Sequence, residues 1–254
     1  MSVPAATLRR VFWRCLFLQA AWNRRGMQNL GFAYAIDPAL RRLYADPGRR
    51  TEALRRHLAT FNCHPYTAAA IVGGAIHHEE RVAAGEEPTS APLAYKQVLQ
   101  GPLAAVGDGF FWAGLRPFFG ALAAVGTLAL GWPALVASLA AYNVLHLWIR
   151  WSLFRAGYRC GDEVVTRLAA LSLPTWAAHL RKGGSVLCGV AAGLFALSAA
   201  GRLGPGAGFL SLVAAAAGLG ALGLRARLLP SAYAAIGLGT AAGMAAQQVF
   251  RGGR

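Results

Sequence analysis

The chain has 254 residues, of which 56% are hydrophobic and only 14% are charged, and its mean hydropathy is +0.42. This composition excludes an ordinary soluble domain and favours a protein embedded in a membrane. The 25 basic and 10 acidic residues give a net charge of +15, which would suit either nucleic acid or the anionic face of a membrane. Long uncharged runs decide for the membrane and exclude a nucleic-acid partner, because a nucleic-acid-binding domain needs a solvated basic face.

Residues 1–60 are strongly basic and contain no apolar run long enough to span a membrane. They hold eleven arginines against three acidic residues, which predicts a cytoplasmic or interfacial segment. Residues 7–22 place apolar side chains along one helical stripe, which favours an amphipathic helix at the membrane surface over a helix buried between domains. Arg9, Arg10 and Arg14 are its expected contacts to lipid headgroups. Arg14 interrupts the apolar segment, so a signal peptide is not predicted.

Two short polar motifs follow. Asn62 and His64 precede a proline that marks a turn, and His64 either accepts a phosphoryl group or, as the more frequent alternative, hydrogen-bonds the turn. The motif His77-His78-Glu79-Glu80 has metal-ligand residue types, but adjacent helical residues point about 100° apart and cannot share one ion. We therefore expect a polar helix end and no metal. Asn62, His64, Glu79 and Glu80 are candidates for cytoplasmic polar structure or a docking surface.

An opposite pair of charges lies inside the apolar sequence that follows. Asp108 separates two short pieces, Gln97–Gly107 and Gly109–Leu115, and Arg116 follows the second. Pieces this short predict re-entrant or discontinuous helices. Because charges in a membrane tend to pair or to face water, Asp108 and Arg116 are expected either to anchor a hairpin as an ion pair or to line a solute path.

Four uncharged runs are long enough to cross a hydrocarbon core of roughly 30 Å. Pro117–Ile149 has 33 residues and would extend about 50 Å as one helix, so a break is expected at Gly131-Trp132-Pro133. The other three runs are Gly183–Gly201, Leu203–Leu224 and Leu228–Phe250.

These runs predict an all-α, polytopic integral membrane protein with three to five transmembrane helices. Three regions are expected: a basic helical region (1–96), re-entrant and broken helices with an interfacial basic segment (97–180), and three C-terminal spans (181–254). Basic residues at the ends of the last three runs, together with the basic N-terminal region, predict a cytoplasmic N-terminus and an external C-terminus.

Nothing in the sequence resembles a self-contained catalytic site. It has no Walker A motif, no GxSxG and no GxGxxG opening a helix after a strand, and its four cysteines show no CxxC spacing. A membrane enzyme using the His77–Glu80 motif and a metal is disfavoured by the same spacing. No catalytic residue, metal or cofactor is therefore expected.

Several blocks, taken in order, resemble one known family: the IID component of the mannose/fructose/sorbose type of bacterial phosphotransferase system. The blocks are RVFWRCLFLQAAWNRRGMQNLGFAYAIDPALRRLY (10–44), ALRRHLATFNCHPYTAAAIVGGAIHHEERVAAG (53–85), GPLAAVGDGFFWAGLRPFFGAL (101–122) and YNVLHLWIRWSLFRAGYRCGDEVV (142–165), with a looser continuation at KGGSVLCGVAAGLF (182–195).

The resemblance implies a subunit of the bacterial cytoplasmic (inner) membrane. In that family the IID subunit pairs with a IIC subunit, as a trimer of IIC–IID heterodimers, to form the path for a hexose. Phosphorylation of the sugar is then carried out by a phosphohistidine on IIB, which is recharged from IIA. The IID subunit is not itself a phosphoryl carrier, and the sugar contacts lie mainly in IIC.

Two departures from the family pattern stand out. The family's Gly-Asp-Pro is here Gly107-Asp108-Gly109, which predicts a more flexible turn after Asp108. The chain also turns quickly through Gly201–Gly208, where family members commonly have a longer polar excursion. These differences leave an alternative to sugar transport, namely a regulatory or scaffolding membrane protein derived from such a system.

Overall fold

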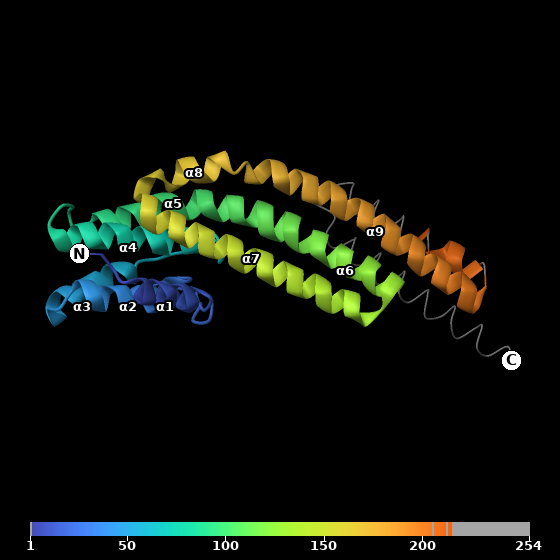
Figure 1. Ribbon diagram of the computed structural model, residues 1–254, viewed down its shortest axis with the longest axis horizontal. Helices are drawn as coiled ribbons and strands as arrows, with labels where there is room; N and C mark the ends of the chain where they lie inside the picture. Colours follow the sequence, from blue (N-terminus) through green and yellow to red (C-terminus); the bar gives the residue numbers. More distant parts are fainter. Residues whose placement is uncertain (1, 205, 212, 215–254) are drawn as a thin grey trace. The chain divides into compact units, whose positions relative to one another are not determined.

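The computed structural model describes residues 2–204, 206–211, 213 and 214, and over these residues the chain is helical and contains no strand (Figure 1). This confirms the expected all-α class. The elements are α1 (Ala5–Cys15), α2 (Asn29–Leu43), α3 (Pro47–His57), α4 (Ala68–Ala84), α5 (Ala91–Gly107), η1 (Asp108–Leu115), α6 (Arg116–Leu130), α7 (Trp132–Cys160), η2 (Gly161–Glu163), α8 (Val164–Ala170) and α9 (Leu173–Leu203).

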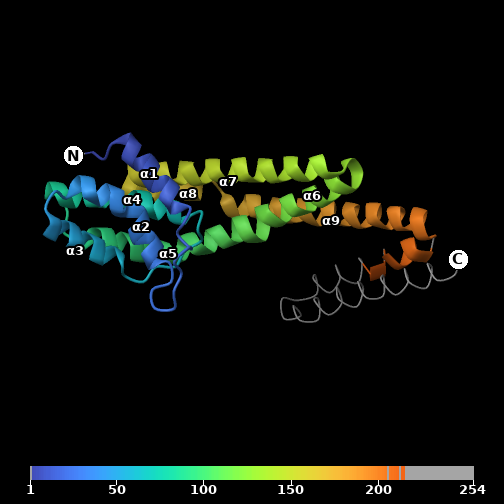
Figure 2. The ribbon, with the colours of Figure 1, turned by 90° about the horizontal axis from the view of Figure 1, so that it is seen from below.

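The chain divides into two compact units. Unit 1 comprises Met1–Arg116 and Ala140–Arg181, and unit 2 comprises Pro117–Leu139 and the residues from Lys182 onward. Within unit 1, α2 packs against α1, α3 and α4, and α4 packs against α5 (Figure 2). Within unit 2, Gly183 and Gly184 of α9 lie close to Phe118 of α6.

Local sequence signals explain several helix ends in unit 1. α3 begins where the Asp46 carboxylate accepts a hydrogen bond from the Arg49 backbone N–H at 2.7 Å, with a proline in the first turn. An aspartate cap followed by proline is a favoured start, because it satisfies a backbone donor and presets φ. α4 ends at Gly85, whose φ of +79° is the left-handed conformation that glycine adopts without a side-chain penalty.

The segment from Ala91 to Leu130 is one continuous helical stretch of 40 residues, long and apolar enough to cross a membrane. The expectation of short re-entrant pieces around Asp108 is therefore wrong, and so is the turn expected there. Apolar side chains on the packed side continue through this point, and the helix widens to π-helical geometry over Asp108–Leu115 instead of breaking. The packed residues are Leu103, Phe110, Phe111 and Leu115.

The break expected at Gly131 is confirmed. α6 ends at Leu130, Gly131 has a φ of +81°, and α7 begins at Trp132. Trp132–Ala170 is the second described segment that is long and apolar enough to span a membrane. The uncharged run 183–201 lies within α9, whereas 203–224 extends beyond the described residues and 228–250 lies outside them.

The N-terminal amphipathic helix is shorter than expected. α1 ends at Cys15, and residues 16–21 form turns. Its apolar stripe packs into unit 1 through Val11, Phe12 and Cys15, while Trp13 is 57% exposed. One face of α1 is therefore buried against the rest of unit 1, and Trp13 lies on the exposed face.

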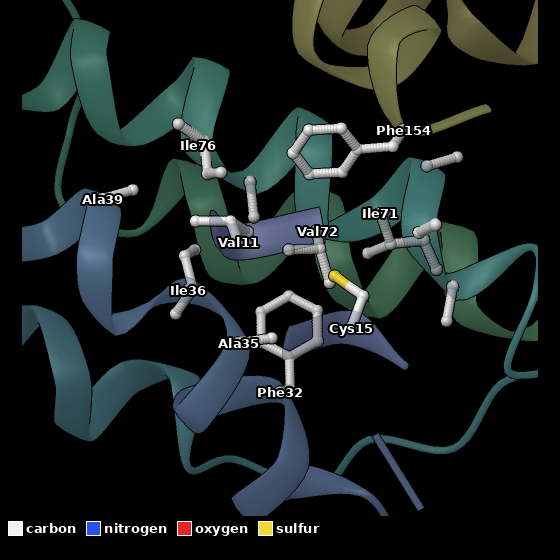
Figure 3. Close-up of a cluster of buried hydrophobic side chains, with 14 of the residues drawn as sticks. Val11, Cys15, Phe32, Ala35, Ile36, Ala39, Ile71, Val72, Ile76 and Phe154 are labelled. Atoms are coloured by element: carbon white, nitrogen blue, oxygen red, sulfur yellow. The ribbon is translucent and has the colours of Figure 1, made fainter. Parts of the chain in front are cut away.

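The core of unit 1 collects side chains from α1, α2, α3, α4, α5, α7 and α8. Figure 3 shows residues of α1, α2 and α4 together with Phe154 of α7 pointing toward one another. Phe12 also meets the ring of Trp151 edge-to-face, at 4.9 Å between centroids. These apolar contacts attach the N-terminal helices to the second membrane-length segment.

Two glycines allow α4 and α7 to touch backbone to backbone. A side-chain carbon on Gly157 would collide with the carbonyl oxygen of Ala70, and one on Gly73 would collide with the carbonyl oxygen of Phe154. Small residues at a crossing let helix backbones approach closely, which increases van der Waals contact where no hydrophobic effect assists.

A fully buried carboxylate, Glu79, joins α4 to α2 and α3. The Arg56 guanidinium donates to both of its oxygens, at 2.7 and 3.0 Å, and the Tyr44 hydroxyl donates to Oε2 at 2.7 Å. His57 Nε2 lies 2.8 Å from Oε1. Burial alone would raise the pKa of Glu79, but the hydrogen bonds from His57 and Arg56 outweigh it and lower the pKa to about 2.

Burial lowers the pKa of His57 from its ordinary value, and its bond to Glu79 opposes this only in part. A neutral imidazole with the proton on Nε2 can donate to the carboxylate, and the opposite nitrogen, Nδ1, is buried without a hydrogen-bond partner. The negative charge of Glu79 is thus matched by one positive charge, that of Arg56.

Gly157→Ala should destabilise the protein, because the new methyl group meets the fixed Ala70 backbone. Overpacking of this kind costs about 1–3 kcal/mol. Gly101→Ala is the matched control, since Gly101 is a helical glycine of unit 1 with open space around it, and alanine should be neutral or stabilising there. Thermal unfolding of both variants in detergent measures the difference. Equal midpoints would contradict the close helix contact.

Glu79→Gln should lower the free energy of unfolding by about 3–5 kcal/mol, because it leaves a largely buried Arg56 uncompensated. The exposed Glu52→Gln should change it by less than about 0.5 kcal/mol. Since the pKa of Glu79 falls from 4.5 to about 2 on folding, its stabilisation is complete above pH 4.5 and is lost as pH falls toward 2. Unfolding midpoints measured from pH 7 to pH 3 should therefore decline more steeply in the wild type than in Glu79→Gln.

Candidate functional site

The polar residues 77–80 lie near the end of α4, as expected, but they are packed inside unit 1. Glu79 is fully buried in the cluster described above, so it has no surface to offer a docking partner. Glu80 Oε1 accepts hydrogen bonds from the Val3 backbone N–H at 2.6 Å and from the Tyr158 hydroxyl at 2.7 Å. Either polar structure or a docking surface was expected of Glu79 and Glu80, and their contacts fit the role in polar structure.

The histidines of the same motif are also engaged within unit 1. His77 Nδ1 lies 3.0 Å from the Tyr158 carbonyl oxygen, and His78 Nδ1 lies 2.8 Å from a Glu87 carboxylate oxygen. The two rings face different neighbours, as expected for adjacent helical residues. In the part of the chain that the structure describes, no group of three histidine, cysteine or acidic side chains is arranged to hold a metal ion.

The sequence did not indicate that two cations are buried. Lys96 is fully buried, and its Nζ donates to the carbonyl oxygens of His57 at 2.9 Å and Ala59 at 3.0 Å. It also lies 4.5 Å from the centre of the Phe32 ring. His57 is the last residue of α3, so the ammonium group caps the negative end of that helix.

Arg150 of α7 plays the corresponding role for α1. It is 3% exposed, and its guanidinium donates to the carbonyl oxygen of Cys15, the last residue of α1. The guanidinium also lies 5.5 Å from the centre of the Tyr66 ring. The sequence around Lys96 and Arg150 did not indicate that either residue caps a helix, because each caps a helix other than its own and reaches it only through tertiary contacts.

The turn that carries His64 is held from both sides. The Gln28 side chain donates to the Cys63 carbonyl at 2.8 Å and accepts from the Cys63 N–H at 3.1 Å. The Asn62 N–H donates to the Gln100 side chain at 3.1 Å. His64 Nδ1 accepts a bond from the Tyr66 N–H at 3.2 Å, as the turn interpretation predicted.

His64 belongs to a group of aromatic rings in mutual contact, here named the His64 cluster, and it meets the rings of Tyr66, Phe111 and Trp112. Its ring stacks on Phe111 at 5.2 Å between centroids and meets Trp112 edge-to-face at 4.9 Å. Tyr66 stacks on His146 at 4.6 Å, and its hydroxyl lies 3.3 Å from that of Tyr142. The members are His64, Tyr66, Phe111, Trp112, Tyr142 and His146.

The electrostatics of this cluster disfavour a charged imidazole. Burial, assisted by the positive charge of Arg150, lowers the pKa of His64 to about 4. His64 Nε2 and His146 Nδ1 are buried without hydrogen-bond partners. Most of the cluster is therefore packed inside unit 1, and Trp112, which is 47% exposed, is its member that reaches the surface.

Asp108 and Arg116 do not form the expected ion pair. Both side chains are exposed, and no ion pair joins them in the described chain. The physical reason is the continuous helix, along which eight residues rise about 12 Å. Asp108, Trp112 and Arg116 instead follow one another at four-residue spacing on the exposed side of η1 and the start of α6. Trp112 connects this outward face to the His64 cluster.

The three N-terminal arginines are not equivalent. Arg9 and Arg10 are exposed, whereas Arg14 Nη1 donates to the Tyr34 carbonyl at 3.0 Å and lies 3.4 Å from Asp37. The Arg14 guanidinium also lies over the Tyr34 ring, at 4.4 Å from its centre. Arg14 is therefore engaged within the protein, and only Arg9 and Arg10 keep the exposure that headgroup contacts require.

Comparison with known proteins agrees with the resemblance read from the sequence. Residues 2–196 match the family model described as the "PTS system mannose/fructose/sorbose family IID component". The mannose-specific EIID component of Escherichia coli K12 is 36% identical over 200 residues, covering 78% of this chain and 68% of the relative. The fructose permease IID component of Bacillus subtilis is 34% identical over 194 residues, covering 74% of this chain and 66% of the relative.

The fold has solved counterparts as well. A chain in the cryo-EM structure of the mannose transporter ManYZ in complex with microcin E492 aligns with a TM-score of 0.61 at 33% identity, covering 76% of this chain and 71% of the other. A second structure, described as a membrane protein, aligns with a TM-score of 0.63 at 34% identity, covering 79% and 71%. The chain therefore belongs to the IID component family of the mannose/fructose/sorbose phosphotransferase systems and is a membrane subunit of a phosphotransferase-system permease.

Proposed function

We propose that this chain forms, with a IIC subunit, the path by which a hexose enters the cell and is phosphorylated by IIB. The main observation in support is the similarity of this chain to a chain of the mannose transporter ManYZ, at 33% identity over 76% of the present chain. The assembly would be a trimer of IIC–IID heterodimers in the inner membrane, with IIA recharging IIB at the cytoplasmic face.

The chain would supply no catalytic group to this reaction. Glu79, Glu80, His77 and His78 are engaged in contacts within unit 1, and His64 accepts a bond from its own turn. A phosphoryl acceptor must be reachable by its donor, but His57 and His64 are both buried. His57 and His64 are therefore not accessible to a phosphoryl donor, and the proposal assigns phosphoryl transfer to the other subunits.

The outward face formed by Asp108, Trp112 and Arg116 would meet the IIC subunit and border the sugar path. Two exposed charges on an apolar, membrane-length helix are costly unless they face water or polar groups of a partner. Trp112 is 47% exposed and touches His64, so this face would place an aromatic ring and polar atoms beside the path. Such a surface suits a sugar, which has apolar C–H faces and hydroxyl groups.

The orientation would follow the distribution of basic residues. The basic N-terminal helices would lie at the cytoplasmic side, and Arg9 and Arg10 would contact anionic headgroups. With three C-terminal spans over 181–254, the C-terminus would lie outside.

Membrane vesicles containing this chain and its IIC partner, supplied with phosphorylated IIB, should accumulate a radiolabelled hexose as its phosphate. Omitting this chain should abolish accumulation, because half of the path is missing. The measurement is uptake of several labelled hexoses with detection of the sugar phosphate. A stable complex with IIC that moves none of them would favour the regulatory alternative instead.

Asp108→Asn and Arg116→Gln should each lower uptake at least ten-fold, since each removes a charge from the face that borders the path. Glu52→Gln, which neutralises an exposed carboxylate of α3, is the control and should leave uptake unchanged. Co-purification with IIC separates two causes: loss of the complex identifies a docking role, and an intact but inactive complex identifies a role in the path. Full uptake in both variants would refute the assignment of this face.

A further inference from the structure

Three exposed arginines surround a small hollow at the end of α7. Ser152, Arg155, Ala156 and Arg159 lie on one side of α7, at the i, i+3, i+4 and i+7 spacing that forms a helix face. Arg167 of α8 completes the lining. The hollow has a volume of about 190 Å³, and all of these residues belong to unit 1.

The lining offers only hydrogen-bond donors and apolar surface to an occupant that carries negative charge. It has three guanidinium groups and one hydroxyl group, and it includes no carboxylate. Two acidic residues are close in sequence, and neither lines this hollow. Asp162 lies 3.6 Å from His78 and borders a different hollow, beside Tyr95, and Glu163 is exposed outside the lining. In the described part of the chain, none of the three arginines takes part in an ion pair.

Like charges at i and i+4 on a helix repel, as Arg155 and Arg159 do here, and a third cation from α8 adds to the repulsion. Some other arginines are compensated within the protein: Arg41 and Arg14 share Asp37, and Arg81 has Glu86 and Glu87. What distinguishes the triad is that its three arginines line one concavity without a carboxylate, so a negatively charged ligand there would relieve the repulsion among them.

We propose that this hollow, the Arg155–Arg159–Arg167 site, binds the phosphate of an anionic lipid headgroup or of a free phosphate ester. Arginine recognises phosphate through paired, charge-assisted hydrogen bonds, and several arginines can share one phosphate through its several oxygens. The volume exceeds the roughly 30 Å³ that one water molecule occupies, so it admits a group of several atoms.

The surroundings favour a lipid as the source of the phosphate. Trp148 on α7 is 64% exposed and lies four residues before Ser152, on the side of the helix that lines the hollow. Exposed tryptophans near basic residues are typical of the headgroup level of a membrane. Acyl chains would then cover the apolar residues while the phosphate occupies the hollow.

The test uses the full chain purified in a mild non-ionic detergent, with native mass spectrometry to count bound phosphatidylglycerol. The triple variant Arg155→Gln, Arg159→Gln, Arg167→Gln should retain at least ten-fold less lipid than the wild type. A second triple, Arg42→Gln, Arg50→Gln, Arg55→Gln, makes the same change in net charge on α2 and α3 and should retain as much as the wild type. Unfolding midpoints of all proteins verify that they are folded.

A third triple, with lysine at the same three positions, keeps the charge but loses the paired geometry of the guanidinium group. It should bind several-fold less than the wild type, whereas a purely electrostatic surface would bind equally. Displacement by millimolar inorganic phosphate or hexose 6-phosphate identifies a free phosphate as the ligand, and resistance to displacement identifies the lipid. Equal retention by the two glutamine triples would overturn the site.

Discussion

The cost of burying charge governs how the helices of unit 1 come together. Glu79 is fully buried, and an isolated carboxylate in that position would be strongly unfavourable. It is stable there only because Arg56, His57 and Tyr44 reach it at once from α3 and from the end of α2. Two stretches of chain, the end of α2 and α3, must therefore be in place before α4 can bury its carboxylate.

The same constraint explains how the buried cations are accommodated. Two buried cations of unit 1, Lys96 and Arg150, are accommodated without a carboxylate. Lys96 and Arg150 use the carbonyl oxygens at the ends of α3 and α1 together with aromatic rings. Helix C-termini carry partial negative charge, so these cations stabilise the helix ends while they are themselves stabilised. Each one also ties an N-terminal helix to a membrane-length segment.

Features determined by residues close together in the sequence were predicted, and features determined by residues far apart in the sequence were missed. The break at Gly131, the cap at Asp46 and the continuation of apolar faces depend on nearby residues, and the break and the all-α class were predicted. The ion pair between Asp108 and Arg116 was predicted wrongly, because it required a broken helix, whereas packing of Phe110, Phe111 and Leu115 keeps the helix continuous. The cluster around Glu79 joins residues 22 to 35 positions apart, and no local spacing indicates it.

The histidines and glutamates of α4, whose residue types first suggested a chemical role, make structural contacts. This favours a function that depends on the surface of the protein. Glu79, Glu80, His77 and His78 all make hydrogen bonds within the folded chain, and among the described residues no three histidine, cysteine or acidic side chains are arranged to hold a metal ion. The charges that the fold leaves outside, Asp108 and Arg116 on one face and the arginines near the end of α7 on another, have no partner that lowers their free energy within the described chain. In a membrane such charges persist only where water, lipid headgroups or another subunit meets them. Both observations agree with a membrane subunit that works through contacts with the other components of its permease.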